Sequence, residues 1–420
     1  MIERLHIENF RSVKLLDISL PKISFFCGPN ASGKTNFSEA LDFLSQTFER
    51  GLAYAIAEKG GFYNMCFRRE RRSRGAIRFD VGGRFKNKNV VLEIEIHFSI
   101  QTRGQAIRSD FYVESESYTF KLESPSGSGF VKIVRSDGTY SCDSSTSFPK
   151  EINHLYPMVR VAKDFFVSNE IRADERTLLY PSPYESFFPF SDQVRGIAAA
   201  KVFRINPRTA RQSGAPSVLG ELGKFGDNLP SALDNLAINH GPAFRRLEDL
   251  LKEVVPALTA LRTRYTASRQ MGLFLQEEGC GNPWDAEELS DGTLMSMALF
   301  VALLQPSYTC VMIEEPENSL HPWILRKFLQ LCEEVSESKQ VMLTTQSPLV
   351  VAIANPENLF LVERKEGITE IVPALEREKI LPEMLKRQFL DLGQYWLSGG
   401  LGAVPVPIDE QGSLFEEPEK

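Results

Sequence analysis

The feature that most constrains this chain is a complete Walker A motif, Gly-Pro-Asn-Ala-Ser-Gly-Lys-Thr, at residues Gly28–Thr35. An apolar run over residues 23–26 precedes the motif, and apolar residues recur at helical spacing from Phe37 to Leu44. A buried strand, a glycine-containing loop and a helix N-terminus gather backbone N–H groups around one point, where they can bind a phosphate chain. The sequence therefore predicts a strand–loop–helix unit that binds a nucleoside triphosphate.

Two residues of the motif have specific expected roles. Lys34 is expected to reach the β- and γ-phosphates, and the Thr35 hydroxyl is expected to be a ligand for Mg²⁺. The expected nucleotide-binding residues are contiguous in the sequence: Gly28, Pro29, Asn30, Ala31, Ser32, Gly33, Lys34, Thr35 and Asn36.

A second apolar run, from Tyr308 to Ile313, ends in two adjacent carboxylates, as a Walker B motif does. Because side chains alternate along a strand, Glu314 and Glu315 should point in different directions and can do different work. We expect Glu314 to hold Mg²⁺ and Glu315 to orient and polarise the attacking water. Acidic pairs also occur at ordinary solvated strand ends, but the Walker A motif in the same chain favours the catalytic interpretation.

Two further segments flank this strand in the sequence. Before it, Ser290 in Leu-Ser-Asp-Gly-Thr is a good N-cap for the apolar helix that follows, and a helix N-terminus attracts anions. A plain capping turn is the alternative interpretation. After it, a predicted strand at residues 341–345 leads to Gln346. We expect the end of that strand to lie beside the strands of the two Walker motifs and to face the γ-phosphate.

Composition favours a globular, cytoplasmic protein. Charged residues make up 25% of the 420 residues and hydrophobic residues 42%, and no stretch approaches the ~20 apolar residues of a membrane span. The first residues lack the apolar core of a signal peptide. The chain has six cysteines and no Cys-x-x-Cys pair, which fits a reduced compartment. We therefore expect no membrane partner.

The charge distribution gives two opposing indications about nucleic acid. A net charge of −7 argues against a protein with general affinity for nucleic acid. One short basic run is an exception, and it either binds phosphate or forms a solvated loop. The run consists of Arg68, Arg69, Arg71, Arg72 and Arg74.

The order of these motifs resembles that of the ABC-type ATPases of the SMC/RecF/OLD group, and in particular the compact ATPases related to OLD proteins. The residues that carry the resemblance are Leu-His-Ile-Glu-Asn-Phe-Arg-Ser at 5–12, Glu-Glu-Pro-Glu-Asn-Ser-Leu-His-Pro at 314–322 and Thr-Thr-Gln-Ser-Pro at 344–348. The resemblance covers most of the chain and is weakest over residues 100–225. It implies an α/β fold, an ABC-type P-loop NTPase head with a mixed central sheet, a β-rich lobe and a large α/irregular insertion.

The resemblance also implies a division of the chain into four segments. Residues 1–90 would form the N-terminal part of the ATPase head with Walker A, and residues 91–275 a β-rich and helical insertion. Residues 276–365 would complete the head with the signature, Walker B and the switch strand. Residues 366–420 would form a C-terminal extension.

The group further implies a homodimer that encloses ATP between head-to-tail protomers. Walker A of one protomer would hold each nucleotide, and the signature residues Ser290, Asp291 and Gly292 of the other would cap it. ATP binding would close the dimer and hydrolysis would release it, which is a two-state switch driven by a ligand. The D-loop at the same interface would consist of Asn318, Ser319 and Leu320.

Two departures from the group's pattern affect the expected activity. Many relatives carry histidine where Gln346 stands, and a glutamine amide can donate a hydrogen bond but cannot relay a proton. We therefore expect Lys34, Glu315 and Gln346 to support slow ATP hydrolysis. Full OLD proteins append a TOPRIM nuclease whose metal site needs a glutamate and an Asp-x-Asp pair. Asp391 and Asp409 stand alone, so we expect no nuclease activity from this chain by itself.

The leading functional hypothesis is an ATPase that senses or regulates a separately encoded effector, a nuclease or TOPRIM-like protein, in an anti-phage defence module. The main alternative is a DNA-repair or maintenance ATPase that clamps DNA directly; the arginine run favours it and the net charge does not. A transporter subunit is disfavoured by the long insert between Walker A and Ser290. A P-loop kinase would have no use for the signature and the Walker B motif.

Overall fold

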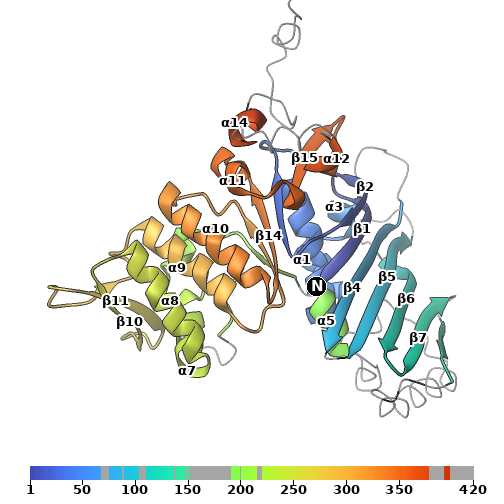
Figure 1. Ribbon diagram of the computed structural model, residues 1–420, viewed down its shortest axis with the longest axis horizontal. Helices are drawn as coiled ribbons and strands as arrows, with labels where there is room; N and C mark the ends of the chain where they lie inside the picture. The colour runs from blue at the N-terminus through green and yellow to red at the C-terminus, as the bar shows by residue number, and fades with distance from the viewer. Residues whose placement is uncertain are drawn as a thin grey trace, which may run out of the picture.

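The strands of the computed structural model form three sheets within the residues it describes (Figure 1). These are a six-stranded mixed sheet, a seven-stranded antiparallel sheet and a small three-stranded sheet. The described residues are 1–67, 75–87, 89–103, 110–136, 139–146, 148, 150, 191–198, 200–214, 220–377 and 392–397.

The six-stranded sheet has the order β16-β15-β3-β14-β13-β9, and all neighbours are parallel except β16 and β15. Every residue of β3, β13 and β14 is buried, as expected of strands that are covered on both faces. The predicted strand before Gln346 is confirmed, because β14 lies between the Walker A strand β3 and the Walker B strand β13. The strands are β3 (Ile23–Cys27), β9 (Ala200–Phe203), β13 (Cys310–Glu314), β14 (Gln340–Thr345), β15 (Leu359–Lys365) and β16 (Ile368–Pro373).

The seven-stranded sheet confirms the predicted β-rich lobe. Its order is β2-β1-β4-β5-β6-β7-β8, and every neighbouring pair is antiparallel. Alternate residues such as Ile94, Ile96 and Phe98 are buried, so one face of the sheet packs on the core. The strands are β1 (Ile2–Phe10), β2 (Val13–Ser19), β4 (Ile77–Asn87), β5 (Val90–Arg103), β6 (Asp110–Ser124), β7 (Gly127–Ser136) and β8 (Thr139–Ser144).

Helix α1 (Lys34–Arg50), which follows the Walker A loop, packs against both large sheets (Figure 1). On one side the ring of Phe37 lies 4.5 Å from that of Phe26 in β3. On the other side the ring of Phe43 lies 5.7 Å from that of Phe79 in β4. The helix that carries Lys34 is therefore fixed by aromatic packing against both sheets.

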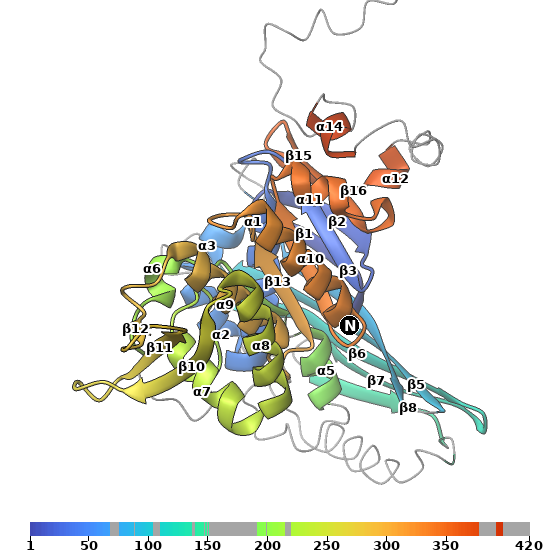
Figure 2. The same ribbon diagram turned by 60° about the vertical axis from the view of Figure 1, so that its left-hand side comes forward.

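Helices cover the other face of the mixed sheet (Figure 2). The most apolar of them, α9, was predicted from the run after Ser290 and is buried along almost its whole length. The small sheet lies in the same lobe and consists of β10 (Leu258–Tyr265), β11 (Met271–Glu277) and β12 (Trp284–Asp285). The remaining helices are α2 (Leu52–Glu58), α3 (Phe62–Met65), α5 (Ser191–Ala198), α6 (Pro207–Ala210), α7 (Leu229–Asn239), α8 (Gly241–Val254), α9 (Asp291–Leu304), α10 (Pro322–Ser336), α11 (Pro348–Ile353), η3 (Pro356–Asn358), α12 (Ala374–Arg377) and α14 (Leu392–Leu397).

The second helical pattern after Asn228 is predicted to run until Pro256. In the structure α8 ends at Val254, and residues from Leu258 onward form β10. Pro256 ends the helix because it lacks an N–H for the helical ladder. Antiparallel pairing with β11 then decides the conformation of the following residues.

The structure can be compared with two further predictions, the absence of a membrane span and the segment boundary at residue 90. Among the described helices, none is both long enough and apolar enough to cross a bilayer. The proposed boundary at residue 90 falls beside the turn between β4 and β5, where Asn87 pairs with Val90. The four-segment division stays a prediction.

Replacing Phe43 with alanine should test the packing of α1. The side chain is fully buried, so Phe43→Ala should lower the free energy of unfolding by about 3–5 kcal/mol, measured by urea denaturation. Leu15→Ala is the control, because Leu15 in β2 is 60% exposed and its loss should change stability by less than about 0.5 kcal/mol. Equal stabilities of the two variants would contradict the described core.

Candidate nucleotide-binding site

The Walker A loop is held so tightly that two of its positions accept only glycine. A Cβ on Gly28 would lie 2.2 Å from the carbonyl oxygen of Val362 in β15. Gly33 has a φ of +111°, and its Cβ would lie 1.9 Å from Oγ1 of Thr369 in β16. The loop thus approaches the β15–β16 hairpin more closely than any side chain would allow.

A small polar cluster that the sequence did not reveal joins this hairpin to the loop. The Thr369 hydroxyl lies 3.1 Å from the carbonyl oxygen of Ser32, to which it can donate, and 2.7 Å from the hydroxyl of Ser12. The amide of Asn36, predicted to bind nucleotide, donates to Ser12 Oγ at 2.5 Å. Ser12 lies in the turn between β1 and β2, so the first two strands and the last hairpin both brace the loop.

The Lys34 ammonium lies over the loop, as its predicted role requires. It donates to the carbonyl oxygens of Gly28 at 2.7 Å and Pro29 at 2.9 Å, and it lies 3.9 Å from Glu315 Oε1. Burial lowers the pKa of Lys34, and the neighbouring carboxylates, first among them Glu315, oppose that shift. A phosphate chain bound at the loop would meet a cation that has already been withdrawn from water.

Glu314 and Thr35, the two predicted magnesium ligands, lie together. Thr35 Oγ1 donates to one oxygen of Glu314 at 3.3 Å, and Ser38 Oγ donates to the other at 2.6 Å. Burial raises the pKa of Glu314. Hydroxyl and carboxylate oxygens suit Mg²⁺, which takes only one or two protein ligands when phosphates and waters complete its shell. Among the described residues, no group of three or more His, Cys, Asp or Glu side chains could hold a metal ion.

Glu315 has different hydrogen-bond partners from Glu314, although it lies just beyond the end of β13 and not within the strand. Its backbone has a φ of +46°, an uncommon conformation that its N–H stabilises by donating to the carbonyl of Thr344 at 2.9 Å. Its carboxylate accepts from Gln346 Nε2 at 3.3 Å and from Asn318 Nδ2 at 3.2 Å. The structure therefore brings the three predicted catalytic side chains, Lys34, Glu315 and Gln346, to one place.

Glu317 has a positioning role that the sequence did not indicate. One of its oxygens accepts from the Thr345 hydroxyl at 2.8 Å and from the backbone N–H of Gln346 at 2.9 Å. Its other oxygen, Oε2, is buried and has no hydrogen-bond partner within the described residues. Burial raises the pKa of Glu317. This side chain fixes the turn from which the Gln346 amide reaches Glu315.

The described contacts of the signature residues are with the first turn of α9, with Arg211 and with the predicted D-loop. Ser290 is the N-cap of α9, and its hydroxyl accepts from the N–H of Thr293 at 3.1 Å, which confirms the predicted cap. A Cβ on Gly292 would lie 3.2 Å from the carbonyl of Ser319, so the signature touches the predicted D-loop. Within the part of the chain that the structure describes, no hydrogen bond or ion pair links residues 290–292 to residues 28–36.

Arg211 is another residue that sequence reasoning missed. Its guanidinium forms an ion pair with Asp291 of the signature and donates to the carbonyl of Glu287 at 3.0 Å. Arg211 follows α6, in a proline-interrupted stretch without periodicity, so no local pattern could have indicated this contact. It holds the loop that leads into α9 from outside that helix.

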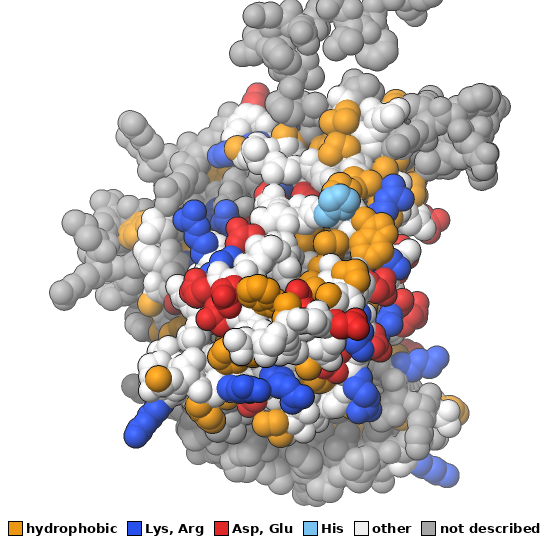
Figure 3. Space-filling model, turned by 90° about the vertical axis from the view of Figure 1, so that its left-hand side faces the viewer, with side chains coloured by type: hydrophobic (Ala, Val, Ile, Leu, Met, Phe, Trp, Pro, Cys, Tyr) orange, Lys and Arg blue, Asp and Glu red, His pale blue; other side chains and the backbone are white. Residues whose placement is uncertain are grey.

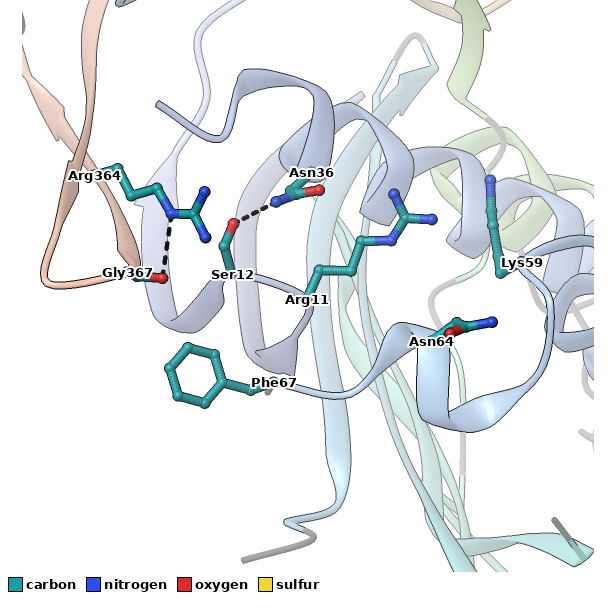
Figure 4. Close-up of a pocket in the computed structure, with 8 residues that line it drawn as sticks. All are labelled: Arg11, Ser12, Asn36, Lys59, Asn64, Phe67, Arg364 and Gly367. Atoms are coloured by element: carbon teal, nitrogen blue, oxygen red, sulfur yellow. Dashed lines mark hydrogen bonds between the residues drawn. The ribbon is translucent and has the colours of Figure 1, made fainter. Parts of the chain in front are cut away.

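A cavity of about 570 Å³ adjoins the start of α1 at Asn36 (Figure 4). The β15–β16 hairpin forms one side of it with Arg364 and Gly367, and the segment after α2 forms the other side. Arg11 and Ser12 come from the β1–β2 turn. The remaining lining residues are Lys59, Asn64 and Phe67. The arginine run at 68–74 follows Phe67 directly, but it lies outside the described residues.

The parallel order of β3, β14 and β13, the Walker A loop and the paired carboxylates define a P-loop NTPase head. A family model described as "AAA domain, putative AbiEii toxin, Type IV TA system" matches residues 23–352, and the chain belongs to this family. The predicted resemblance to the SMC/RecF/OLD group is confirmed by two curated relatives.

The first relative is the OLD nuclease of Thermus scotoductus, 24% identical over 386 residues, which are 90% of this chain and 65% of that protein. The second is the DNA replication and repair protein RecF of Lactobacillus acidophilus, 45% identical over 47 residues, 11% of this chain and 12% of RecF. The matched regions thus span less than two thirds of either relative's length. A solved structure of an Smc head bound to the C-winged helix domain of ScpA aligns with a TM-score of 0.48 at 15% identity, covering 88% of this chain and 96% of that one.

Removing the Arg211 side chain should separate signature alignment from nucleotide binding. Arg211→Ala breaks a partly exposed ion pair, so the free energy of unfolding should fall by less than about 1 kcal/mol. ATP binding should persist, whereas ATP turnover should fall several-fold because Asp291 loses its brace. Arg246→Ala is the control, since it removes an exposed pair with Glu334 elsewhere on the molecule. Wild-type turnover in Arg211→Ala would contradict a role for this contact.

Proposed function

We propose that this chain is an ATPase that closes as a head-to-tail homodimer around ATP and Mg²⁺ and thereby regulates a separate effector. One observation carries the proposal. Lys34, Glu315 and Gln346 converge at the Walker A loop, whereas Ser290 caps α9 and, within the described part of the chain, makes no hydrogen bond to that loop. Each chain thus offers two half-sites that become complete only against a second copy.

The described contacts account for the chemistry at the first half-site. The ammonium of Lys34 and the N–H groups of the loop bind the phosphates. Thr35 and Glu314 would hold Mg²⁺, which neutralises charge on the β- and γ-phosphates when bound. Glu315, aligned by the amides of Gln346 and Asn318, orients the attacking water and takes up its proton.

The cavity beside Asn36 supplies a place for the ribose and base. It opens at the N-terminus of α1, where the phosphates are bound, and it is lined by the ring of Phe67 and by cationic and amide side chains. An aromatic ring can stack on a base, and cations favour the phosphate end. We infer ATP rather than GTP because the sequence contains no Asn-Lys-x-Asp element that reads guanine.

Slow turnover is part of the proposal. The Gln346 amide already donates to Glu315 and, unlike histidine, cannot carry a proton away. ATP binding, rather than rapid hydrolysis, would then be the signal. A steady-state rate above ~10 s⁻¹, the median for enzymes, would contradict this point.

The effector is proposed by analogy, as a nuclease or TOPRIM-like protein in an anti-phage defence module. The supporting observation is the similarity to a relative named OLD nuclease. The segment between the seven-stranded sheet and Ser290 would receive that partner or a trigger. A cytoplasmic location fits this role.

A second candidate function is a repair or maintenance ATPase that clamps DNA directly. The similarity of 47 residues to RecF favours it, as does the arginine run at 68–74. On the face seen in Figure 3, however, acidic and basic side chains are interspersed rather than sorted into a basic surface. DNA affinity that falls steeply with salt and disappears when these arginines become glutamates would favour the clamp.

Two variants should separate nucleotide binding from hydrolysis. Lys34→Ala removes the phosphate-binding cation and should abolish ATP binding, measured by calorimetry. Glu315→Gln removes the group that takes up the proton of water, so it should bind ATP, fail to hydrolyse it and accumulate as a dimer in sedimentation velocity runs. Hydrolysis at the wild-type rate by Glu315→Gln would refute the assignment of this carboxylate.

The effector hypothesis predicts what this trapped variant retains in cells. Tagged Glu315→Gln, recovered from its native host, should bring down one stoichiometric protein with a nuclease or TOPRIM-like domain. Lys34→Ala is the matched control and should recover much less of it. DNA without a protein partner, retained in moderate salt, would instead favour the clamp.

A further inference from the structure

Arg204 follows directly after β9, the parallel strand next to the Walker B strand. The pairing of β9 with β13 matches Ala200 with Cys310 and runs to Phe203 with Ile313. Continuing the same register places Arg204 level with Glu314. The carboxyl ends of parallel strands meet at one edge of the sheet, and ligands bind at that edge.

Strand alternation brings Arg204 to the same face as Glu314. Ala200 and Val202 belong to the hydrophobic cluster that contains α1, whereas Phe203 belongs to the cluster on the opposite face. Arg204 is the next residue of the alternating series on the α1 face. This is the face on which Thr35 and Ser38 contact Glu314.

Two backbone hydrogen bonds fix the segment that begins with Arg204. Its N–H donates to the carbonyl of Lys224 at 2.7 Å, and the N–H of Asn206 donates to the carbonyl of Phe225 at 3.0 Å. The Lys224 ammonium donates in turn to Glu39 and Asp42 of α1, at 2.8 Å each. The segment is therefore tied to the helix that begins with Lys34.

The Arg204 guanidinium is exposed and has no hydrogen bond or ion pair within the described residues. The continued register places it level with Glu314, on the α1 face of the sheet. A cation without a partner among the described residues thus lies at the same edge of the sheet as the predicted magnesium ligand.

We propose that Arg204 contacts the γ-phosphate of the ATP bound to its own chain. This inference rests on the proposed ATPase function and adds a residue to the same site. The planar guanidinium binds phosphate oxygens in pairs, and a cation at the transferred phosphoryl group stabilises the charge of the transition state. A further cation suits this site, because Gln346 is neutral and Glu314 and Glu315 both add negative charge beside the phosphates.

The contact predicts a difference between ATP and ADP. ATP binding is measured in the Glu315→Gln background, which prevents hydrolysis. In that background Arg204→Ala should weaken ATP binding by about tenfold, which corresponds to the loss of one charge-assisted hydrogen bond. Binding of ADP should stay unchanged, since ADP has no γ-phosphate. In the protein with Glu315 intact, Arg204→Ala should lower ATP turnover by up to about 10³-fold, and Arg204→Lys should retain part of the wild-type turnover. Arg208→Ala is the control, because Arg208 is a second exposed arginine four residues away in the same segment.

The outcomes distinguish this inference from the proposed function. Equal losses of ATP and ADP affinity in Arg204→Ala, or a large fall in its melting temperature, would show that Arg204 only neutralises nearby carboxylates and would overturn the proposal. Unchanged ATP affinity and turnover, with binding still lost in Lys34→Ala, would overturn the Arg204 contact alone. Failure of the wild type to bind ATP would overturn the proposed function together with this contact.

Discussion

The constraint on which the rest of the structure depends is the position of α1 between two sheets. A helix covered on both sides must bury charged residues along with its aromatic ones, and each buried charge needs a partner. Glu39 and Asp42 meet this requirement by accepting hydrogen bonds from Lys59 and Lys224. These two lysines come from segments far apart in the sequence, so the cluster ties three parts of the chain to one helix.

The pKa of Glu39 reflects its hydrogen bonds with the two lysines of this cluster. Burial alone would raise it, but hydrogen bonds from Lys224 and Lys59 hold the pKa down, at about 2. A carboxylate whose folded pKa lies below its unfolded value stabilises the fold above the unfolded value of 4.5, and this contribution is lost as the pH falls toward 2. Near neutral pH Glu39 is therefore ionised, and its hydrogen bonds with Lys224 and Lys59 hold α1, which carries Lys34, Thr35 and Ser38, in place.

The sequence predicted those parts of the site that lie in short local patterns. The Walker A motif, the Walker B carboxylates and the cap at Ser290 each depend on a few consecutive residues. The two carboxylates do have different partners, but the positive φ of Glu315 just after β13, and not strand alternation, separates them. The sequence also predicted that β14 lies beside the two Walker strands, and the structure adds that it lies between them. Local patterns specify these features because strand, turn and cap geometry are themselves local.

The residues that brace the site could not be found in this way. Thr369 contacts Ser32 across 337 positions of sequence, and Arg211 reaches Asp291 across 80. Arg204 lies after a four-residue strand whose place beside β13 is visible only in the assembled sheet. Such contacts depend on which strands become neighbours in the sheet, and the order of strands in a sheet cannot be read from local patterns in a single sequence.

The central claim is that each catalytic site combines the Walker A loop of one protomer with the signature of another. Mixing two inactive variants, Lys34→Ala and Ser290→Arg, tests it most directly. In a mixed dimer one site would join an intact Walker A loop to an intact signature, so ATP hydrolysis should reappear and peak at equal amounts of the two proteins. A mixture as inactive as either variant alone would contradict the shared site.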